Sequence, residues 1–257
     1  MSSLDDYLKA YLRERPLFLS LLRAKEAYLY RKYLPLARPS MDFGCGDGFF
    51  AGVAIGKNKI DLGLDVKESR IGEAIREGIY KKTVIYEGLT IPFEKKSITT
   101  LVSNSVLEHV SDLDRVIFEI SRVVAPGGKV LTTVMTRKWE DYLLGTKIIG
   151  KSYQNILRKK QVHVNLLTRK EWDRKFEKNG FLIKKCIGHM DRTFCRFVEV
   201  FHYLSIPSLI SFKVFNKWVL FSQLADFLYP RMFLTGIISK DVNPDESGAL
   251  FYELLRK

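Results

Sequence analysis

The chain has 257 residues, 46% of them hydrophobic, enough to bury the core of one elaborated domain. Its three cysteines, Cys45, Cys186 and Cys195, lack paired or metal-ligand spacing, which excludes a disulfide scaffold and a cysteine metal site and favours a cytoplasmic location. The net charge of +13 is concentrated in residues 137–220, which hold 18 Lys/Arg against 7 Asp/Glu, so phosphates, nucleic acid or an anionic membrane are the partners it favours over a plain solvated surface.

The first 39 residues predict a helical lid. Residues 4–34 are amphipathic at helical spacing, and Pro16 indicates a break between two helices. The first six residues are acidic and lack an apolar signal core, which argues against secretion.

A glycine loop follows a short apolar strand that ends at Asp42. Gly44, Gly46 and Gly48 stand at every second position, and an apolar helix begins at Phe49. The dinucleotide fingerprint would need its third glycine at Phe49, and Asp42 would repel a pyrophosphate. The same carboxylate suits a ligand with an ammonium group. S-adenosylmethionine (SAM), which carries an ammonium, a sulfonium and an adenosine, therefore fits this loop better than NAD.

Further strands and helices alternate along the next ninety residues. An acidic residue at the tip of the second strand, Asp65, is placed to accept hydrogen bonds from ribose hydroxyls. A helix over 113–124 has apolar residues at a 3.6-residue period, with Ser111 and Asp114 as its expected N-terminal cap. Residues 126–128, Pro-Gly-Gly, predict a stop before the fifth strand. The expected strands are 59–66, 83–86, 100–104 and 129–135.

The second half adds two unusual segments to this pattern. Residues 137–162 form a basic, aromatic insert, and residues 190–247 are dense in aromatic and aliphatic side chains. No apolar run in 190–247 reaches the roughly 18–20 residues of a membrane span. Lys213 and Lys217 beside Trp218 resemble an interfacial helix, so this segment is either a cap over the pocket or a cap that also contacts a membrane. The remaining expected elements are a helix over 169–179 closed by Gly180, a sixth strand over 181–187 and a last strand over 249–255.

Five segments together resemble the class I SAM-dependent methyltransferases, in the small-molecule group with LPF/VLEHV/PGG-type motifs. They are Asp42–Gly48, Asp65, Ile91–Phe93, Val106–Val110 and Pro126–Gly128. Glu87 and Thr99 depart from the family, which usually has Asp at these positions. The resemblance implies an α/β fold, a doubly wound Rossmann-like seven-stranded sheet with helices on both faces, plus a helical, aromatic cap inserted near the C-terminus. The implied organisation is a lid (1–39), a SAM-binding core (40–189), a cap (190–247) and a final core strand (248–257).

The resemblance also implies residues for the cofactor. Asp42 and the backbone of Gly44, Cys45 and Gly46 would surround the methionine part, and Asp65 would hold the ribose. Val66 would pack on the adenine, whose edge Glu87, Gly88 and Leu89 would line. Asn104 would offer backbone near the methionine end, and Arg23, with Arg31 as second choice, would meet the methionine carboxylate.

Methyl transfer needs a base only when the acceptor must lose a proton. The candidates are His109 and Glu108, near the end of the fourth strand, and His163, directly after the basic insert. Histidine has the suitable pKa. The alternative for His109 is a role in shaping the cofactor pocket.

The expected function is methyl transfer to a small or lipid-linked acceptor, with O-methylation favoured and with peripheral contact at the inner face of the membrane. One alternative is a nucleic-acid methyltransferase, but the stretch after the fourth strand reads Asn104-Ser-Val-Leu and lacks the Pro-Pro of base-amine methylation. Another is a non-catalytic, membrane-associated protein, against which the intact Asp42, glycines and Asp65 argue. The sequence does not indicate the acceptor or the oligomeric state.

Overall fold

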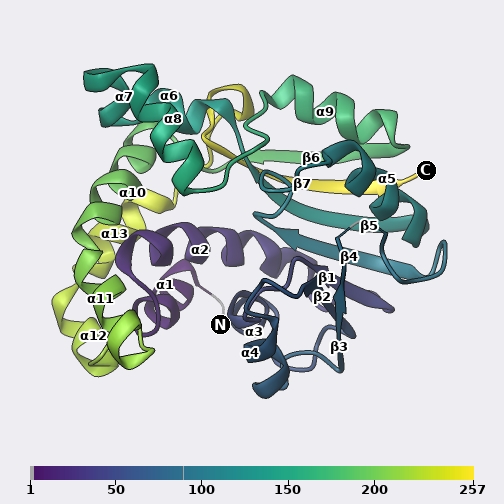
Figure 1. The fold of residues 1–257 in the computed structure, drawn as a ribbon, viewed down its shortest axis with the longest axis horizontal. Helices are drawn as coiled ribbons and strands as arrows, with labels where there is room; N and C mark the ends of the chain where they lie inside the picture. Colours follow the sequence, from purple (N-terminus) through teal and green to yellow (C-terminus); the bar gives the residue numbers. More distant parts are fainter. Residues whose placement is uncertain (1–2, 89) are drawn as a thin grey trace.

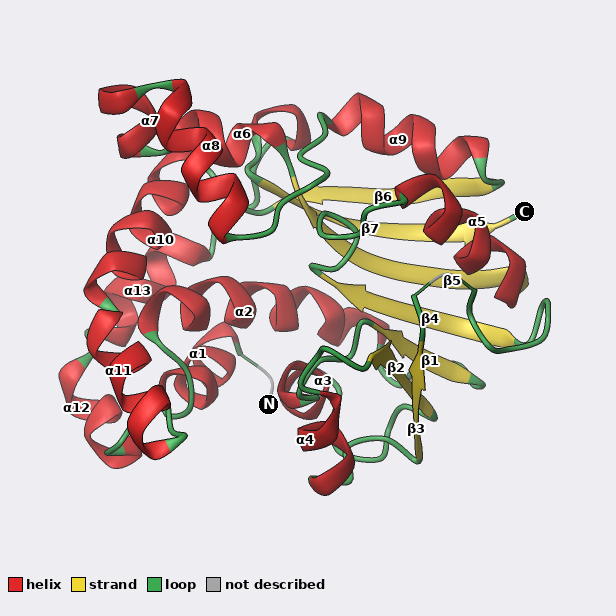
Figure 2. Cartoon of the chain, viewed as in Figure 1, coloured by secondary structure: helices red, strands yellow, loops and turns green. Residues whose placement is uncertain are grey.

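A mixed seven-stranded sheet forms the centre of the molecule (Figures 1 and 2). The structure is a computed structural model that describes residues 3–88 and 90–257. The strand order is β3-β2-β1-β4-β5-β7-β6, and only β7 runs antiparallel to its neighbours. The strands are β1 (Ser40–Phe43), β2 (Leu62–Val66), β3 (Lys82–Tyr86), β4 (Ile98–Asn104), β5 (Val124–Met135), β6 (Phe181–Gly188) and β7 (Ala249–Arg256).

Helices cover both faces of this sheet, and a further group of helices lies beyond one end of it (Figure 2). Those of the first half are α1 (Leu4–Leu12), α2 (Leu17–Tyr30), the 3-10 turn η1 (Arg31–Tyr33), α3 (Phe49–Ala54), α4 (Ile71–Arg76) and α5 (Leu113–Val123). Those of the second half are α6 (Arg137–Tyr142), α7 (Leu144–Ile149), α8 (Lys151–Lys160), α9 (Arg169–Lys178), α10 (Arg192–Leu204), α11 (Ile206–Phe215), η2 (Ser222–Leu224), α12 (Ala225–Leu228), α13 (Arg231–Ile238) and η3 (Pro244–Glu246).

Successive residues of the central strands face two separate cores, because strand side chains alternate between the two faces of a sheet. Leu101, Val130 and Leu250 pack with α5 and α9 on one face. Their chain neighbours Val102, Leu131 and Phe251 pack with α3, α4 and the end of α2 on the other. Helices therefore cover both faces, and the predicted doubly wound fold is confirmed.

The lid, the basic insert and the cap share a third core. Its buried side chains include Tyr7 of α1, Trp139 of α6, Leu157 of α8 and Phe194 of α10. In Figure 1 helices α10–α13 stand in a column at one end of the molecule, with α7 and α8 beside them and the C-terminus at the opposite end. Helix α2 runs between this column and the sheet. The segments predicted as separate additions thus pack together as one helical end.

Two local predictions are wrong. The Pro-Gly-Gly segment does not stop the chain before the fifth strand, since β5 begins at Val124, which pairs with Ile98 before a register shift. The cap of α5 is Asp112, whose Oδ1 accepts a hydrogen bond (3.0 Å) from the Arg115 amide. Asp114, a predicted cap residue, instead pairs with Lys175 at 2.7 Å. Asp112 directly precedes the helix, so its carboxylate can reach the free amide groups of the first turn, whereas Asp114 lies within that turn.

Within residues 3–88 and 90–257, one bent pair of helices has the length and composition that could cross a membrane. Among the described residues no single helix has the length and apolar composition of a span. Helices α10 and α11 together meet those criteria of length and composition across a 48° bend.

Candidate active site

The order of the strands places the predicted residues at one edge of the sheet. Neighbouring strands β1 and β4 lead outward in opposite directions, to β2 and β3 on one side and to β5 on the other. Ligands of open α/β sheets bind outside the carboxyl ends of the strands at such a reversal. The glycine loop follows β1, Asp65 is the second-last residue of β2, and Asn104 is the last residue of β4. The structure therefore brings the predicted cofactor residues to this edge.

The glycine loop has its amide groups turned inward. Gly44 and Cys45 donate to the Leu64 carbonyl at 2.8 and 3.1 Å, and Gly46 donates to Asp65 Oδ2 at 2.6 Å. Gly44 has φ +78°, and a β-carbon there would lie 2.3 Å from Val106 Cγ2. These three amides are unavailable to a pyrophosphate, which needs a cradle of free N–H groups. Burial raises the pKa of the Cys45 thiol, so this residue fills the loop as a thiol.

Asp42 lies within β1 and behind the loop. Its side chain is buried, and Oδ2 accepts a 2.6 Å hydrogen bond from the Tyr80 hydroxyl. Burial raises the pKa of Asp42 to about 7, against the effect of the Tyr80 hydrogen bond, and the neighbouring Asp65 raises it further. A cation near this carboxyl would stabilise its ionised form and so oppose the rise in pKa that burial and Asp65 cause. The contact with an ammonium group stays a prediction, and the structure adds an anchoring contact to Tyr80.

Asp65 and Val66 occupy the end of β2. The Asp65 carboxylate accepts from the Gly46 amide and, at 2.8 Å, from the Val66 amide, and it is half-buried. Each carboxylate oxygen can accept a further bond, which is what ribose hydroxyls require. A β-carbon on Gly88 would lie 3.5 Å from Val66 Cγ1, so these two predicted adenine neighbours adjoin. Glu87 is exposed, and Leu89 lies outside the described residues.

Arg23 belongs to a polar network that joins the lid to β4. Its Nη1 donates to Glu26 Oε2 at 2.6 Å and to Ser105 Oγ at 2.7 Å. Glu26 is fully buried and also accepts from Asn104 Nδ2 at 2.9 Å. The role of Glu26 could not be predicted from the sequence, because an acidic residue inside an amphipathic helix gives no signal of its distant partners. Arg31, the second choice, instead lies in η1 with its guanidinium stacked over Tyr28.

We expect Glu26→Gln to lower the free energy of unfolding by about 2 kcal/mol, because the Arg23 guanidinium loses its buried anionic partner. Chemical denaturation measures this. Glu177→Gln, an exposed substitution of the same kind on α9, is the control and should change stability by less than about 0.5 kcal/mol. Equal stability of the two variants would contradict a structural role for Glu26.

A cavity of about 240 Å³ opens beside this network. Its walls come from α2, the segment after β4, the insert and α10, and they are mostly apolar. The main lining residues are Phe18, Leu22, Arg23, Ser105, Glu108, His109, Met135, Trp139, Tyr153, Leu157, His163, Val198, Glu199, His202 and Tyr203. We call this cavity the acceptor pocket.

The predicted base candidates meet in the acceptor pocket. The ring centroids of His109 and His163 lie 5.0 Å apart, although 54 positions separate the two residues in the sequence. His109 Nδ1 is 3.0 Å from the Val162 carbonyl, to which it must donate, so the lone pair is left on Nε2. Burial lowers the pKa of His109, and it lowers that of His163 to about 4 with further contributions from His109 and Arg158. Both imidazoles are therefore neutral near pH 7.

Glu108 is fully buried beside these histidines. Neither carboxyl oxygen has a hydrogen-bond partner among the described residues, and burial raises the pKa of Glu108 to about 8. A carboxyl group with this pKa is protonated at pH 7 and can donate a hydrogen bond. Glu108 is thus a poor candidate for the base at neutral pH.

Helix α10 contributes polar groups that the sequence analysis missed. His202 lines the pocket with its ring 4.8 Å from that of Phe18. Glu199 accepts a 2.6 Å hydrogen bond from the Tyr153 hydroxyl, which is 2.8 Å from the Tyr203 hydroxyl. Three of the four histidines of the chain line this one cavity. The sequence offered no signal for His202, because its helix reads as an apolar cap.

A larger cavity of about 670 Å³ lies between the α1–α2 turn, helices α3 and α4 and the segment after α11. Much of its charge is paired within its own walls, as in Arg15–Asp47 at 2.7 Å and Arg70–Glu73 at 2.5 Å. It lacks the histidines and the residues that follow β4. The predicted base candidates therefore lie in the acceptor pocket and not in this larger cavity.

The fold and the arrangement at the strand reversal are those of the class I methyltransferases. Residues 41–132 match the family described as "Methyltransferase domain". The match identifies a methyltransferase domain in this part of the chain, on a fold of the class I, SAM-dependent type.

Known proteins agree with this class. A ubiquinone biosynthesis O-methyltransferase of Methylococcus capsulatus is 28% identical over 161 residues, which cover 58% of this chain and 61% of that protein. Among solved structures, a possible histamine N-methyltransferase of Thermotoga maritima has a TM-score of 0.57 at 17% identity and covers 98% of this chain and 95% of that one. A geranyl diphosphate C-methyltransferase of Streptomyces coelicolor has a TM-score of 0.57 at 16% identity, with 94% and 84% covered. These structural likenesses concern the fold.

The curated relatives are matched over only part of their length. The matched stretch spans 67%, 28% and 61% of the first three of them. The methyltransferase class therefore rests on the core domain, and the helical end of this chain has to be interpreted from its own residues.

Proposed function

We propose that the chain transfers a methyl group from SAM to a hydroxyl group of a small or lipid-linked, largely apolar acceptor. The observation that carries this proposal is the acceptor pocket, where a neutral histidine pair stands among apolar walls beside the network at the end of β4. A hydroxyl must lose its proton to become a good nucleophile, and a neutral imidazole is a suitable base.

The residues at the strand reversal suit SAM better than a dinucleotide. Asp65 would hold the ribose and Val66, Glu87 and Gly88 the adenine, with Leu89 and the backbone of Asn104 completing the predicted set. Asp42 supplies negative charge behind a loop whose inward amides offer nothing to phosphate. Arg23 would meet the methionine carboxylate from the lid. When bound, SAM supplies an electrophilic methyl group with a neutral thioether as leaving group.

The residues of the acceptor pocket have separate roles in this proposal. His109 accepts the proton at Nε2 while Val162 holds its Nδ1–H. Protonated Glu108 donates a hydrogen bond to the acceptor. His163, whose lower pKa makes it a weaker base, packs beside His109 and helps to exclude water.

A lipid-linked acceptor is favoured by the apolar walls and by what two relatives act on. The curated relative from Methylococcus is named for ubiquinone biosynthesis, and the Streptomyces structure holds geranyl diphosphate. Both names point to prenyl chemistry in those proteins. We extend this to the present chain as a proposal. Peripheral contact of residues 190–247 with a membrane is a separate proposal that does not depend on methyl transfer.

Labelled transfer tests the proposed function. The protein is incubated with SAM carrying a radioactive methyl group and, separately, with a lipid extract, a soluble-metabolite extract and total RNA. Base-stable label in the lipid or metabolite fraction is expected for a methyl ether. Label in RNA alone would establish the nucleic-acid alternative. Absence of SAM binding by calorimetry at millimolar cofactor would support the non-catalytic alternative.

A further inference from the structure

The helical end of the molecule exposes an unusual amount of apolar surface. Of the 24 large hydrophobic side chains that are exposed in the described residues, 15 lie between positions 200 and 233. Phe227 and Met232 are 87% and 90% exposed. We call these 15 residues the apolar end: Val200, Tyr203, Leu204, Ile206, Leu209, Ile210, Val214, Phe215, Leu220, Phe221, Leu224, Phe227, Leu228, Met232 and Phe233. Monomeric soluble proteins rarely expose contiguous apolar patches of large area.

Helix α11 shows that this surface is not the back of an ordinary amphipathic helix. It reads Ile-Pro-Ser-Leu-Ile-Ser-Phe-Lys-Val-Phe, and its buried residue is Ser211. Ile206, Ile210 and Val214 are all more than half exposed. A helix that is apolar all round normally lies in a core or in contact with lipid. Something outside this chain is therefore expected to cover it.

The charges of the apolar end point to what covers it. Residues 200–233 contain four charged side chains, Lys213, Lys217, Asp226 and Arg231. Asp226 pairs with Arg13, and Arg231 pairs with Asp5 at 3.3 Å. Lys213 and Lys217 are exposed, and the adjoining insert (137–162) carries seven Lys/Arg against two Asp/Glu. An apolar surface with exposed lysines and no unpaired acid complements an anionic bilayer.

We propose that the apolar end inserts into the interface of an anionic lipid bilayer, with α11–α13 lying in the membrane surface. Phe227, Leu228 and Met232 enter the acyl boundary. Lys213 and Lys217 remain at the level of the headgroups. Because α11 is short and α10 bends away from it by 48°, the helices lie on the bilayer and do not cross it.

The acceptor pocket and the apolar end share one residue of α10. Tyr203 lines the pocket and is also one of the exposed residues of the apolar end. The Tyr203 hydroxyl lies 2.8 Å from the Tyr153 hydroxyl, and the next residue, Leu204, is exposed at the surface. A lipid-linked acceptor could thus pass from the bilayer along α10 into the pocket. This last step rests on the proposed function, whereas binding to the bilayer does not.

Vesicle flotation of the full chain without SAM tests the insertion. The vesicles contain either phosphatidylcholine alone or equal parts of phosphatidylcholine and phosphatidylglycerol. We expect the protein to float with the mixed vesicles and to bind pure phosphatidylcholine much more weakly. Lys213→Ala with Lys217→Ala should lower partitioning into mixed vesicles about 30-fold. Raised salt should weaken the binding of the wild type more than that of this variant.

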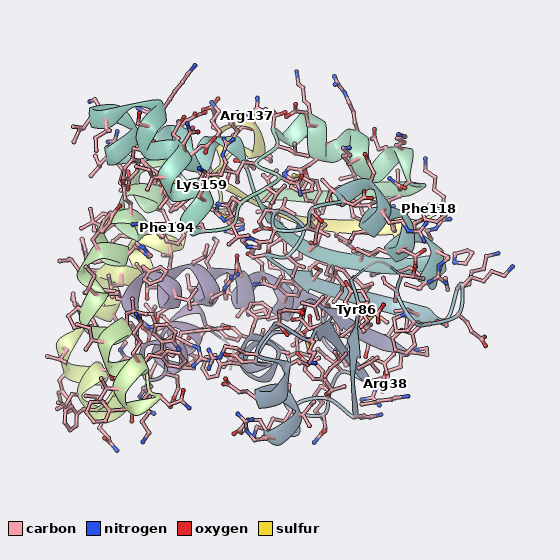
Figure 3. All side chains as sticks on the ribbon, viewed as in Figure 1. Arg38, Tyr86, Phe118, Arg137, Lys159 and Phe194 are labelled. Carbon is pink, nitrogen blue, oxygen red and sulfur yellow. The ribbon has the colours of Figure 1, made fainter. Side chains whose placement is uncertain are left out.

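A second variant tests the apolar contact. Phe227→Ser with Met232→Ser should lower partitioning at least about 100-fold, since two large side chains no longer leave water. Phe118→Ser is the matched control, because Phe118 is exposed on α5 at the other end of the molecule (Figure 3). The control should float as the wild type does. Equal flotation of wild type and Phe227/Met232 variant would overturn the proposal.

Sedimentation of the same proteins without lipid tests whether a second copy of the chain covers the apolar end instead of a bilayer. We expect a monomer in every case. A wild-type dimer that the Phe227/Met232 substitutions dissociate would overturn the proposal in favour of self-association. A protein that floats but shows no SAM binding would keep the membrane contact and refute the proposed function, so the two failures are distinguishable.

Discussion

We expect Asp65→Ala to lower the affinity for SAM about 100-fold and to leave the protein folded. The substitution removes two hydrogen bonds from the ribose hydroxyls to a charged acceptor, each contributing about 1.5 kcal/mol or more. It also releases the Gly46 amide, which Asp65 Oδ2 holds at 2.6 Å, so the glycine loop keeps only the bonds of Gly44 and Cys45 to the Leu64 carbonyl of β2. Isothermal titration with SAM measures the affinity, and thermal unfolding reports whether the fold persists.

Asp61→Ala is the control for this substitution. Asp61 precedes β2, at the opposite end of the strand from Asp65, and it also holds backbone, accepting from the Ser40 amide at 2.9 Å and pairing with Lys81 at 2.9 Å. The control should be destabilised to a similar degree with unchanged affinity for SAM. An Asp65 variant that binds SAM as the wild type does would show that the ribose lies elsewhere.

The core of the fold could be predicted because its signals are local. Alternating apolar strands and helices, the glycine loop after β1 and an acidic residue at the tip of β2 each stand within a few residues of one another. The strand reversal between β1 and β4 then follows from the fold class and places Asp65 and Asn104 at one edge. The helix cap at Asp112 was missed because three polar candidates lie within four positions, and only backbone geometry selects among them.

The acceptor pocket could be predicted only in part, because contacts distant in the sequence build it. His109 and His163 were candidates on chemical grounds, but their 5.0 Å approach depends on how the insert folds back over β4. His202 and Glu26 gave no local signal, and each acquires its role from a partner about 80 or more positions away, at Asn104 for Glu26 and at Phe18 for His202. Sequence patterns report the period of an element and not its tertiary neighbours.

Burial decides the protonation of this pocket and could not be read from residue types. Histidine and glutamate have ordinary pKa values that would make Glu108 the anion and the histidines partly charged at pH 7. The structure reverses this, since burial raises the pKa of Glu108 to about 8 and lowers that of His109. The pocket is therefore close to neutral. That suits an uncharged, apolar acceptor and leaves the imidazole free to take a proton.

His109→Gln should lower kcat for methyl transfer by about 10²–10⁴ while leaving the affinity for SAM unchanged. The glutamine side chain fills much of the space of the imidazole, whose Nδ1 lies 3.0 Å from the Val162 carbonyl, but it cannot act as a base at the position of Nε2. His163→Gln is the matched comparison and should reduce kcat much less. The assay is the labelled transfer to the lipid or metabolite fraction described above.

The pH profile distinguishes the base from a residue that only shapes the pocket. A base works in its unprotonated form, and burial lowers the pKa of His109 below its usual 6.5. The wild-type rate should therefore rise with pH through a pKa below 6.5 and fall again above about pH 8, where Glu108 loses the proton that it donates to the acceptor. The His109→Gln variant should lose this rise along with most of its rate. If the variant instead keeps the wild-type profile at reduced rate, the proton goes to another group, and His109 serves only to shape the pocket.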